Sequence, residues 1–226
     1  MFTTLLWDVD GTLLDFKAAE KAAIADCFEQ FGIPPYTPQM IERYSQINQY
    51  YWQQLELGTV EKPKMLVQRF ADFFEEYGID CDPAAFNQLY QSRLGEHVVF
   101  FPYALETLQK NKGKYKQYAV TNGTATAQHK KLSKSGLDQI FDGIFISDLL
   151  GAEKPDIAFF NQVFDAIGNP KKEEVLIIGD SLSGDIKGGN NAGIATCWFN
   201  PKGLPKNLEV SVDFEIQSLK DIENIL

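Results

Sequence analysis

The sequence contains little cysteine, and its cysteines are not arranged as a disulfide framework. The three residues, Cys27, Cys81 and Cys197, are far apart and form no CxxC pair. Because disulfide frameworks need an even and denser set, this number is typical of a protein from a reducing compartment. The two histidines, His97 and His129, have no partner at metal-ligand spacing. We therefore expect a cytoplasmic protein.

Basic residues are also scarce. Lys and Arg total 21 against 31 Asp and Glu, which gives a net charge of -10. Polymeric nucleic acids and anionic membranes attract basic surfaces, so we expect neither as a partner. A small phosphorylated metabolite remains compatible, because a single site can be positive or neutralised by a metal on an acidic protein.

Long apolar runs are absent as well. No stretch approaches the roughly 20 apolar residues that span a bilayer, and "FTTLLW" near the start is too short for a signal sequence and follows no basic residue. The 226 residues are nevertheless 44% apolar and 13% aromatic, enough for a substantial core. The length suits one large domain, or a core domain with a smaller insert. We expect a monomer or a small homo-oligomer.

Apolar segments that resemble strands alternate with expected helices over much of the chain. The expected strands are "TTLLWDV", "KQYAVT", "GIFIS", "EVLIIG", "IATCWF" and "VDFEI". The expected helices between them lie at about 103–112, 125–135, 155–167 and 184–192. Near-continuous apolar strands alternating with helices predict an α/β fold, a Rossmann-like parallel sheet with helices on both faces. Ligands of such sheets bind beyond the carboxyl ends of the strands.

Residues 16–97 interrupt this alternation and predict helices only. Gly32, Gly58, Gly78 and Gly95 stand where helices would end. We therefore expect an α/β catalytic core made of 1–15 and 98–226, with an all-helical cap of 16–97 inserted after the first strand. Such an insert would leave and re-enter near the carboxyl edge of the sheet.

The stretch "DVDGT" places two carboxylates at the end of the first strand. Residues two apart on a strand point the same way, so Asp8 and Asp10 would share a side. Gly11 then permits a tight turn. Two carboxylates that close repel each other unless a cation joins them, and Mg²⁺ is the cation expected for oxygen ligands and a substrate phosphate.

Three further strand ends supply complementary groups. "VLIIGDSLSGD" places Asp180 at the end of a strand near Asp8, with Asp185 in the loop that follows. "AVTNGT" offers the Thr121 hydroxyl, the Asn122 side chain and backbone N–H groups around Gly123 to a phosphate. "GAEKPD" adds Lys154 before a helix that Pro155 can begin.

Together, "DVDGT", "VTNG", the Lys of "EKP" and "GDSLSGD" resemble, in order and approximate spacing, the four motifs of the haloacid dehalogenase (HAD) superfamily. The resemblance covers essentially the whole chain. It implies that Asp8 attacks phosphorus and becomes an aspartyl-phosphate, and that Asp10 acts as general acid and base.

The resemblance also implies the remaining roles. Mg²⁺ would be held by the Asp8 and Asp180 side chains and the Asp10 backbone carbonyl. The phosphate-binding residues would be Thr121, Asn122, Gly123 and Lys154. Asp185 would orient Lys154 or complete the outer shell of the metal.

Within the superfamily, the chain looks most similar to house-cleaning pyrimidine nucleoside 5′-monophosphate nucleotidases. The matching stretches are "FDAIGNP", "DIKGGNNAGIATCWFN" and the aromatic run "YSQINQYYWQQLELG". That run has two interpretations. Tyr44, Ile47 and Tyr51 can form the core of the insert, whereas Asn48 and Trp52 could face the site and bind a base.

Alternative functions remain open from the sequence. A sugar-phosphate phosphatase or a phosphomutase would share all four motifs. A haloacid dehalogenase is disfavoured, because Asp10 and a Mg²⁺ site belong to the phosphotransfer members. A catalytically silent ligand-binding protein on the same scaffold is the alternative outside enzymes, although it would not require Asp8, Asp10, Lys154 and Asp180 together.

Overall fold

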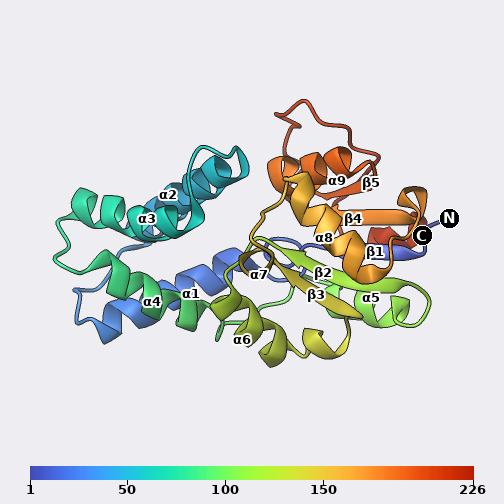
Figure 1. The fold of residues 1–226 in the computed structure, drawn as a ribbon. Helices are drawn as coiled ribbons and strands as arrows, with labels where there is room; N and C mark the ends of the chain where they lie inside the picture. Colours follow the sequence, from blue (N-terminus) through green and yellow to red (C-terminus); the bar gives the residue numbers. More distant parts are fainter.

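The protein consists of a six-stranded parallel sheet flanked by helices and a separate group of four helices (Figure 1). The computed structural model describes residues 1–226. The strands are β1 (Thr4–Trp7), β2 (Lys116–Thr121), β3 (Gly143–Ile146), β4 (Val175–Gly179), β5 (Ala195–Phe199) and β6 (Phe214–Ile216). Their order is β3-β2-β1-β4-β5-β6, so β1 lies in the middle, paired with β2 and β4. The predicted α/β class with a parallel sheet is confirmed.

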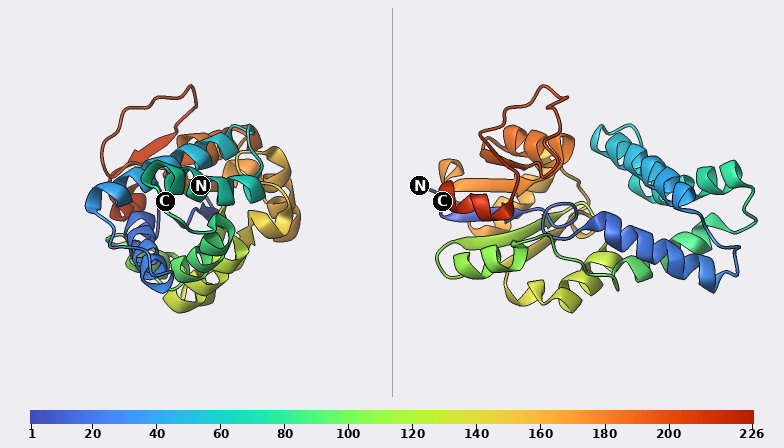
Figure 2. Two further views of the ribbon diagram at one scale, coloured as in Figure 1. Left: turned by 90° about the vertical axis from the view of Figure 1, so that its left-hand side faces the viewer. Right: turned by 180° about the vertical axis from the view of Figure 1, so that it is seen from behind.

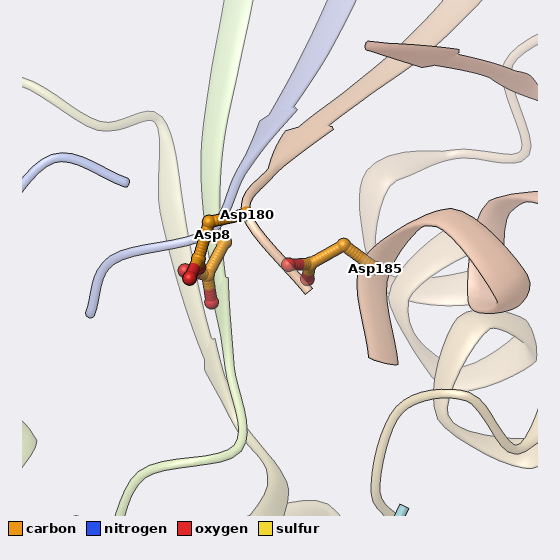
Figure 3. A group of neighbouring side chains, drawn as sticks. All are labelled: Asp8, Asp180 and Asp185. Carbon is orange, nitrogen blue, oxygen red and sulfur yellow. The ribbon is translucent and has the colours of Figure 1, made fainter. Parts of the chain in front are cut away.

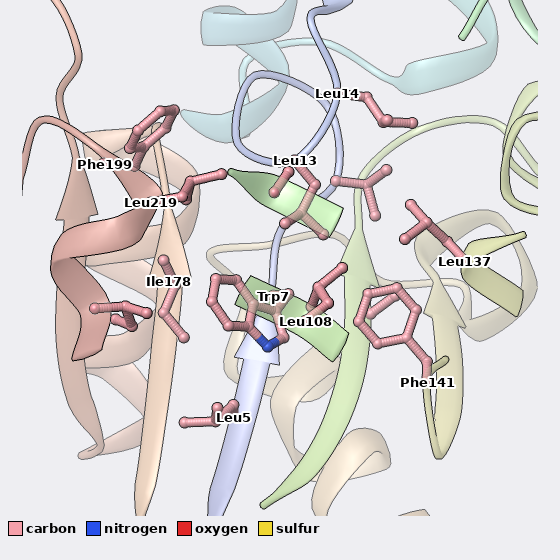
Figure 4. Packing of buried hydrophobic residues seen from close by; sticks show 14 of the residues in the cluster. Leu5, Trp7, Leu13, Leu14, Leu108, Leu137, Phe141, Ile178, Phe199 and Leu219 are labelled. Carbon is pink, nitrogen blue, oxygen red and sulfur yellow. The ribbon is translucent and has the colours of Figure 1, made fainter. Parts of the chain in front are cut away.

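Both faces of the sheet are covered by helices. The helices of the sheet region are α5 (Ala104–Asn111), α6 (Ala125–Ser135), α7 (Ser147–Leu150), α8 (Ile157–Ile167) and α9 (Lys187–Ala192), with short helical turns η1 (Leu137–Gln139), η2 (Lys172–Glu174), η3 (Leu182–Ile186) and η4 (Leu219–Asn224). Alternate residues of β1 face opposite sides. Trp7 packs with Leu108 and Leu219 on one face (Figure 4), and Leu6 packs with Phe159 on the other. Burial on both faces explains why these strands read as continuous apolar runs.

Four helices follow β1 and form their own hydrophobic cluster. They are α1 (Phe16–Gln30), α2 (Pro38–Glu56), α3 (Lys62–Tyr77) and α4 (Pro83–Leu94). Asp15, Thr37 and Asp82 cap the starts of α1, α2 and α4 by accepting hydrogen bonds from backbone N–H groups. This helical insert projects from the carboxyl ends of the strands, whereas both chain termini lie at the opposite end of the sheet (Figure 2). The all-helical character predicted for this stretch is confirmed.

Several local features differ from the sequence-based expectation. β1 ends at Trp7 rather than Val9, because the chain already turns there and the Val9 carbonyl accepts hydrogen bonds from the backbone of Leu13 and Leu14. The helix expected at 184–192 begins as the π-helical turn η3 and continues as α9. The short helix α7 and the turn η4 were not anticipated. No helix is both long and apolar enough to cross a membrane.

Candidate active site

The turn after β1 places Asp8, Gly11 and Thr12 next to the end of β4. Gly11 has φ +98°, and a Cβ at this position would come within 2.6 Å of the Asp180 carboxylate. Only glycine therefore fits both the turn and the close approach. The buried Thr12 hydroxyl lies 3.1 Å from Asp8 Oδ2 and 3.3 Å from Asp180 Oδ1. One hydroxyl thus lies between the carboxylates that follow the paired strands β1 and β4.

Lys154 is the buried cation of this site. Its Nζ donates to Asp8 Oδ1 at 2.8 Å, to Asp185 Oδ1 at 2.7 Å and to the Val120 carbonyl at 2.8 Å. All three ammonium protons therefore have acceptors. The lysine connects the ends of β1 and β2 to the turn η3, which follows β4.

Asp8, Asp180 and Asp185 form a cluster of carboxylates at the carboxyl ends of the strands. One oxygen from each lies within 4.8 Å of the others, and Figure 3 shows the Asp185 carboxylate directed toward the other two. Asp8 and Asp185 are buried, whereas Asp180 is exposed. Asp185 also accepts a hydrogen bond from the Ser181 N–H at 3.1 Å. The cluster offers oxygen ligands to a hard divalent cation.

Burial and the neighbouring charges both change the pKa values of these carboxyls. Burial raises the pKa of Asp8 from 3.8 to about 7, although Lys154 opposes this increase. Burial likewise raises the pKa of Asp185, again opposed by Lys154. For Asp180, desolvation contributes to a raised pKa, but because the side chain is exposed we assign most of the increase to the charges of Asp8 and Asp185. Three carboxylates facing one ammonium leave negative charge that a divalent cation would neutralise.

The expected phosphate loop follows β2 directly. Thr121 is buried, and its Oγ1 accepts a hydrogen bond from the Gly123 N–H at 3.0 Å. The Asn122 side chain binds the backbone of Lys154. Its Nδ2 donates to the Lys154 carbonyl and its Oδ1 accepts from the Lys154 N–H, both at 2.8 Å. Asn122 therefore holds the backbone of Lys154 in place, and phosphate binding by this loop stays a prediction.

The Asp10 carboxylate binds partners other than those of Asp8. It forms an ion pair with Lys131 and accepts a hydrogen bond from Gln128 Nε2 at 2.5 Å, both from α6. It is not part of the cluster of three carboxylates, whose third member is Asp185. The neighbouring carboxylates of "DVDGT" thus have separate cations.

The helical insert contacts the core beside this cluster through the two ends of its α2–α3 connection. Glu56, the last residue of α2, accepts hydrogen bonds from the hydroxyls of Ser181, at 3.1 Å, and Ser183. Lys62, the first residue of α3, is buried, donates to Ser147 Oγ at 2.8 Å and pairs with Asp148. The connection is therefore held to α7, which follows β3, and to Ser181 and the turn η3, which follow β4.

The aromatic run of α2 separates into two environments. Tyr44 and Ile47 are buried in the hydrophobic cluster of the insert, with Tyr51 partly buried against it, which confirms the packing interpretation for these three. Asn48 is 2% exposed; its Nδ2 donates to Glu20 at 2.7 Å and its Oδ1 accepts from Arg69.

Trp52 lies one turn from the end of α2, with its ring centroid 6.0 Å from Lys62 Nζ. Trp52 is partly exposed, and it lies near the junction of insert and core because Lys62 beside it donates to Ser147. Asn48 is enclosed within the insert. Contact of either residue with a base stays a prediction.

Five polar residues of the site were missed from the sequence: Gln128, Lys131, Glu56, Lys62 and Ser181. Gln128 and Lys131 stand in the polar stretch "AQHKKLSKS", where they cannot be distinguished from solvated residues of a surface helix. Glu56 and Lys62 flank a loop and likewise have no local signature. Ser181, inside "GDSLSGD", and Glu56, inside "YSQINQYYWQQLELG", lay in segments that had been singled out, but neither residue was assigned a role there.

Comparison with known proteins gives a consistent result over the full chain. The sequence model of the family described as haloacid dehalogenase-like hydrolase matches residues 5–199. YfnB of Bacillus subtilis, whose name assigns it to the HAD-hydrolases without an activity, is 40% identical over 225 residues, covering 100% of this chain and 95% of YfnB. Its crystal structure, described as bound to magnesium and as revealing interdomain movement, superposes with a TM-score of 0.94 and covers 100% of this chain and 98% of the other.

Two similar proteins have names that state a substrate class. The pyrimidine 5′-nucleotidase PynA of Streptococcus pneumoniae is 35% identical over 98% of this chain and 94% of its own length. The pyrimidine 5′-nucleotidase YjjG of Escherichia coli is 27% identical over 98% of this chain and 96% of its own length.

Proposed function

This chain belongs to the haloacid dehalogenase-like hydrolases, and from that premise we propose that it is a Mg²⁺-dependent phosphatase acting on a small phosphomonoester. The observation that carries the proposal is the contact between Lys154 and the carboxylates of Asp8 and Asp185, with Asp180 beside them. This arrangement lies at the carboxyl ends of parallel strands, where ligands of such sheets bind.

The proposed reaction proceeds in two displacements. A carboxylate oxygen of Asp8 attacks phosphorus in line, the bond to the leaving oxygen breaks, and the phosphoryl group is carried on Asp8. Asp10 gives a proton to the leaving alcohol and then takes one from the water that hydrolyses the aspartyl-phosphate. Lys154 and the loop of Thr121 and Gly123 bind the phosphoryl oxygens, while Asp185 and Asn122 hold Lys154 in position.

The residues present fit a Mg²⁺ ion. Asp8 and Asp180 supply carboxylate oxygens near one another, and the cluster carries more negative charge than Lys154 balances. We propose that these two side chains and the Asp10 carbonyl hold the ion. When bound, Mg²⁺ would neutralise charge between the Asp8 carboxylate and the phosphate.

We further propose that the substrate is a pyrimidine nucleoside 5′-monophosphate. The names of PynA and YjjG, which match over nearly the whole chain, support this choice. Residues 16–97 would act as the cap over a core of 1–15 and 98–226. Trp52 is the aromatic side chain of α2 at the insert–core junction, and a ring in this position could stack on a base.

The proposed function predicts phosphate release from a defined panel of phosphorylated metabolites. We expect UMP, dUMP or dTMP to be hydrolysed at least about tenfold more efficiently than purine monophosphates or sugar phosphates, because about 1.4 kcal/mol of selective contact suffices for this ratio. Colorimetric phosphate release with and without Mg²⁺ measures it. Preference for a sugar phosphate would retain the reaction and overturn the nucleotidase assignment. Absence of turnover with every compound would favour a ligand-binding protein.

A second prediction concerns Mg²⁺ and pH. Because the folded-state pKa of Asp8 is raised from 3.8 to about 7, the fold loses stability as the pH rises through this interval and the buried carboxyl ionises. A divalent cation on the carboxylate opposes that loss, whereas protonation at low pH competes with the cation.

We therefore expect Mg²⁺ at about 100 times its Kd to raise the Tm by roughly 5–10 °C at pH 8, and by much less at pH 5.5. Differential scanning fluorimetry at both pH values measures the shift, and Asp180→Asn should reduce it at pH 8. An equal Tm shift at both pH values would contradict binding at Asp8.

A further inference from the structure

Asp10 is held by two side chains of α6 that no motif includes. Lys131 forms an ion pair with one carboxylate oxygen, and Gln128 donates from Nε2 to the other at 2.5 Å. The two donors lie one turn apart on the same face of the helix. Both oxygens of Asp10 are therefore bound by one rigid element.

Both α6 side chains are almost completely buried. Lys131 and Gln128 are each 1% exposed. The ammonium of Lys131 has Asp10 as its only hydrogen-bond and ion-pair partner, with the Phe16 ring 5.7 Å away. Gln128 likewise makes its only side-chain hydrogen bond to Asp10, while its buried Oε1 has no partner. Neither side chain has a second polar contact that would explain its burial.

An ion pair as buried as this one gives little net stability, because desolvation offsets the attraction between the charges. An apolar side chain would fill the same position on α6 without that penalty. What the pair does provide is a defined direction for the Asp10 carboxylate. Burial of Lys131 is therefore better explained by orientation than by stability.

The same helix is also joined to the predicted phosphate loop. Thr124, the N-cap of α6, directly follows Thr121 to Gly123. Gln128 packs so closely on Gly123 that a Cβ at Gly123 would come within 2.1 Å of Gln128 Nε2. A displacement of the loop therefore moves the side chain that binds Asp10. Residues of one helix therefore contact both the predicted phosphate loop and the Asp10 carboxylate.

We propose that Lys131 and Gln128 are positioning residues that orient Asp10 for proton transfer. This proposal rests on the proposed function, in which Asp10 is the general acid and base. In this role the two α6 residues act on the reaction through their contacts with Asp10. Their removal should impair proton transfer while leaving substrate binding largely unchanged.

The test is a double-mutant cycle on kcat and KM with UMP, or with the panel compound that is hydrolysed fastest. Lys131→Met should lower kcat by about 10–100-fold and change KM less than threefold. Without its cation, the Asp10 carboxylate adopts several orientations, and only some of them allow proton transfer. In an Asp10→Asn background, the same change should lower kcat less than twofold, since its target is already absent. Gln128→Leu should show the same pattern with a smaller loss.

Lys134→Met is the matched control, because it removes an exposed lysine of the same helix that has no contact with Asp10. It should leave kcat and KM unchanged. Circular dichroism melting checks the fold of each variant. If Lys131→Met fails to fold, two comparisons remain. Gln128→Leu is compared with the wild type, and the double variant Asp10→Asn with Lys131→Met, which removes both charges, is compared with Asp10→Asn.

Two results would overturn the positioning role alone. One is a full additional loss of kcat in the Asp10→Asn background, and the other is a raised KM with unchanged kcat, which would place Lys131 on the phosphate loop. A wild-type protein without activity on any phosphomonoester would instead overturn the proposed function, and this proposal with it.

Discussion

Replacement of Asp8 by Asn is expected to reduce phosphate release by about 10⁴-fold or more, because the proposed nucleophile is lost while its surroundings are retained. Asp8 is buried, and Lys154 and Thr12 fix the direction of its two oxygens. A carboxamide of the same shape has no anionic oxygen to attack phosphorus. No other carboxylate in the cluster has this position at the end of β1.

The fold should tolerate this change. Burial already disfavours the charged form of Asp8, as its raised pKa of about 7 shows. The neutral Asn oxygen can still accept the hydrogen bond from Lys154, so we expect the Tm to change by only a few degrees.

Phosphate release with the preferred panel compound, measured with circular dichroism melting of the same preparation, tests both parts. A variant that melts normally and keeps more than a hundredth of the wild-type rate would contradict Asp8 as nucleophile. If the variant lost no biological activity at all, the silent ligand-binding alternative would be favoured.

Replacement of Lys154 by Met is expected to have the largest effect on stability, about 3–5 kcal/mol in the free energy of unfolding. The ammonium is buried and makes all three of its hydrogen bonds to protein acceptors, two of them the carboxylates of Asp8 and Asp185. Burial alone would lower the pKa of Lys154, but Asp185 and Asp8 reverse this and raise it. Met has a similar length and leaves both carboxylates without their cation.

The loss should depend on pH in a defined direction. Without Lys154, the pKa values of Asp8 and Asp185 rise further, so both carboxyls can take up protons at low pH and avoid buried charge. The destabilisation should therefore be larger at pH 8 than at pH 5.5. Urea unfolding without added metal at the two pH values measures it.

Two controls separate this effect from general loss of a lysine. Lys171→Met removes a cation that is 72% exposed and pairs with Glu174, and should change the free energy of unfolding by less than about 1 kcal/mol. Addition of Asp185→Asn to Lys154→Met should restore part of the stability, because it removes one of the two uncompensated charges. A loss that is equal for Lys154→Met and Lys171→Met would contradict the buried ion-pair network.

It was predictable that the carboxylate motifs and the phosphate loop lie close together in space, because each motif follows an apolar strand. "LLW", "YAV" and "VLII" are continuous apolar segments, and such segments form strands covered on both faces. Parallel strands end at one edge, so Asp8, Lys154 and Asp180 were expected near each other. Their residue types alone then indicated phosphate chemistry with a divalent cation.

The polar pairing within the site was not predictable in the same way. Asp10 and Lys131 are 121 residues apart in the chain, and Glu56 and Ser181 are 125 apart. Nothing in the immediate sequence of a lysine or glutamate distinguishes a buried partner of such a pair from a solvated surface charge. The Asn122 amide shows the same limit, since nothing in its sequence context indicates its two hydrogen bonds to the backbone of Lys154.

The sequence by itself therefore determined the α/β class, the all-helical insert and the edge of the sheet at which the four motifs meet. Hydrophobic periodicity and glycine or proline punctuation are local properties, and they specify which side of each element is buried. Only the tertiary structure decided that Lys154 pairs with Asp8 and Asp185 while Asp10 pairs with Lys131. The reason is physical: the partner of a buried charge depends on which distant elements pack together, and local patterns carry no record of that choice.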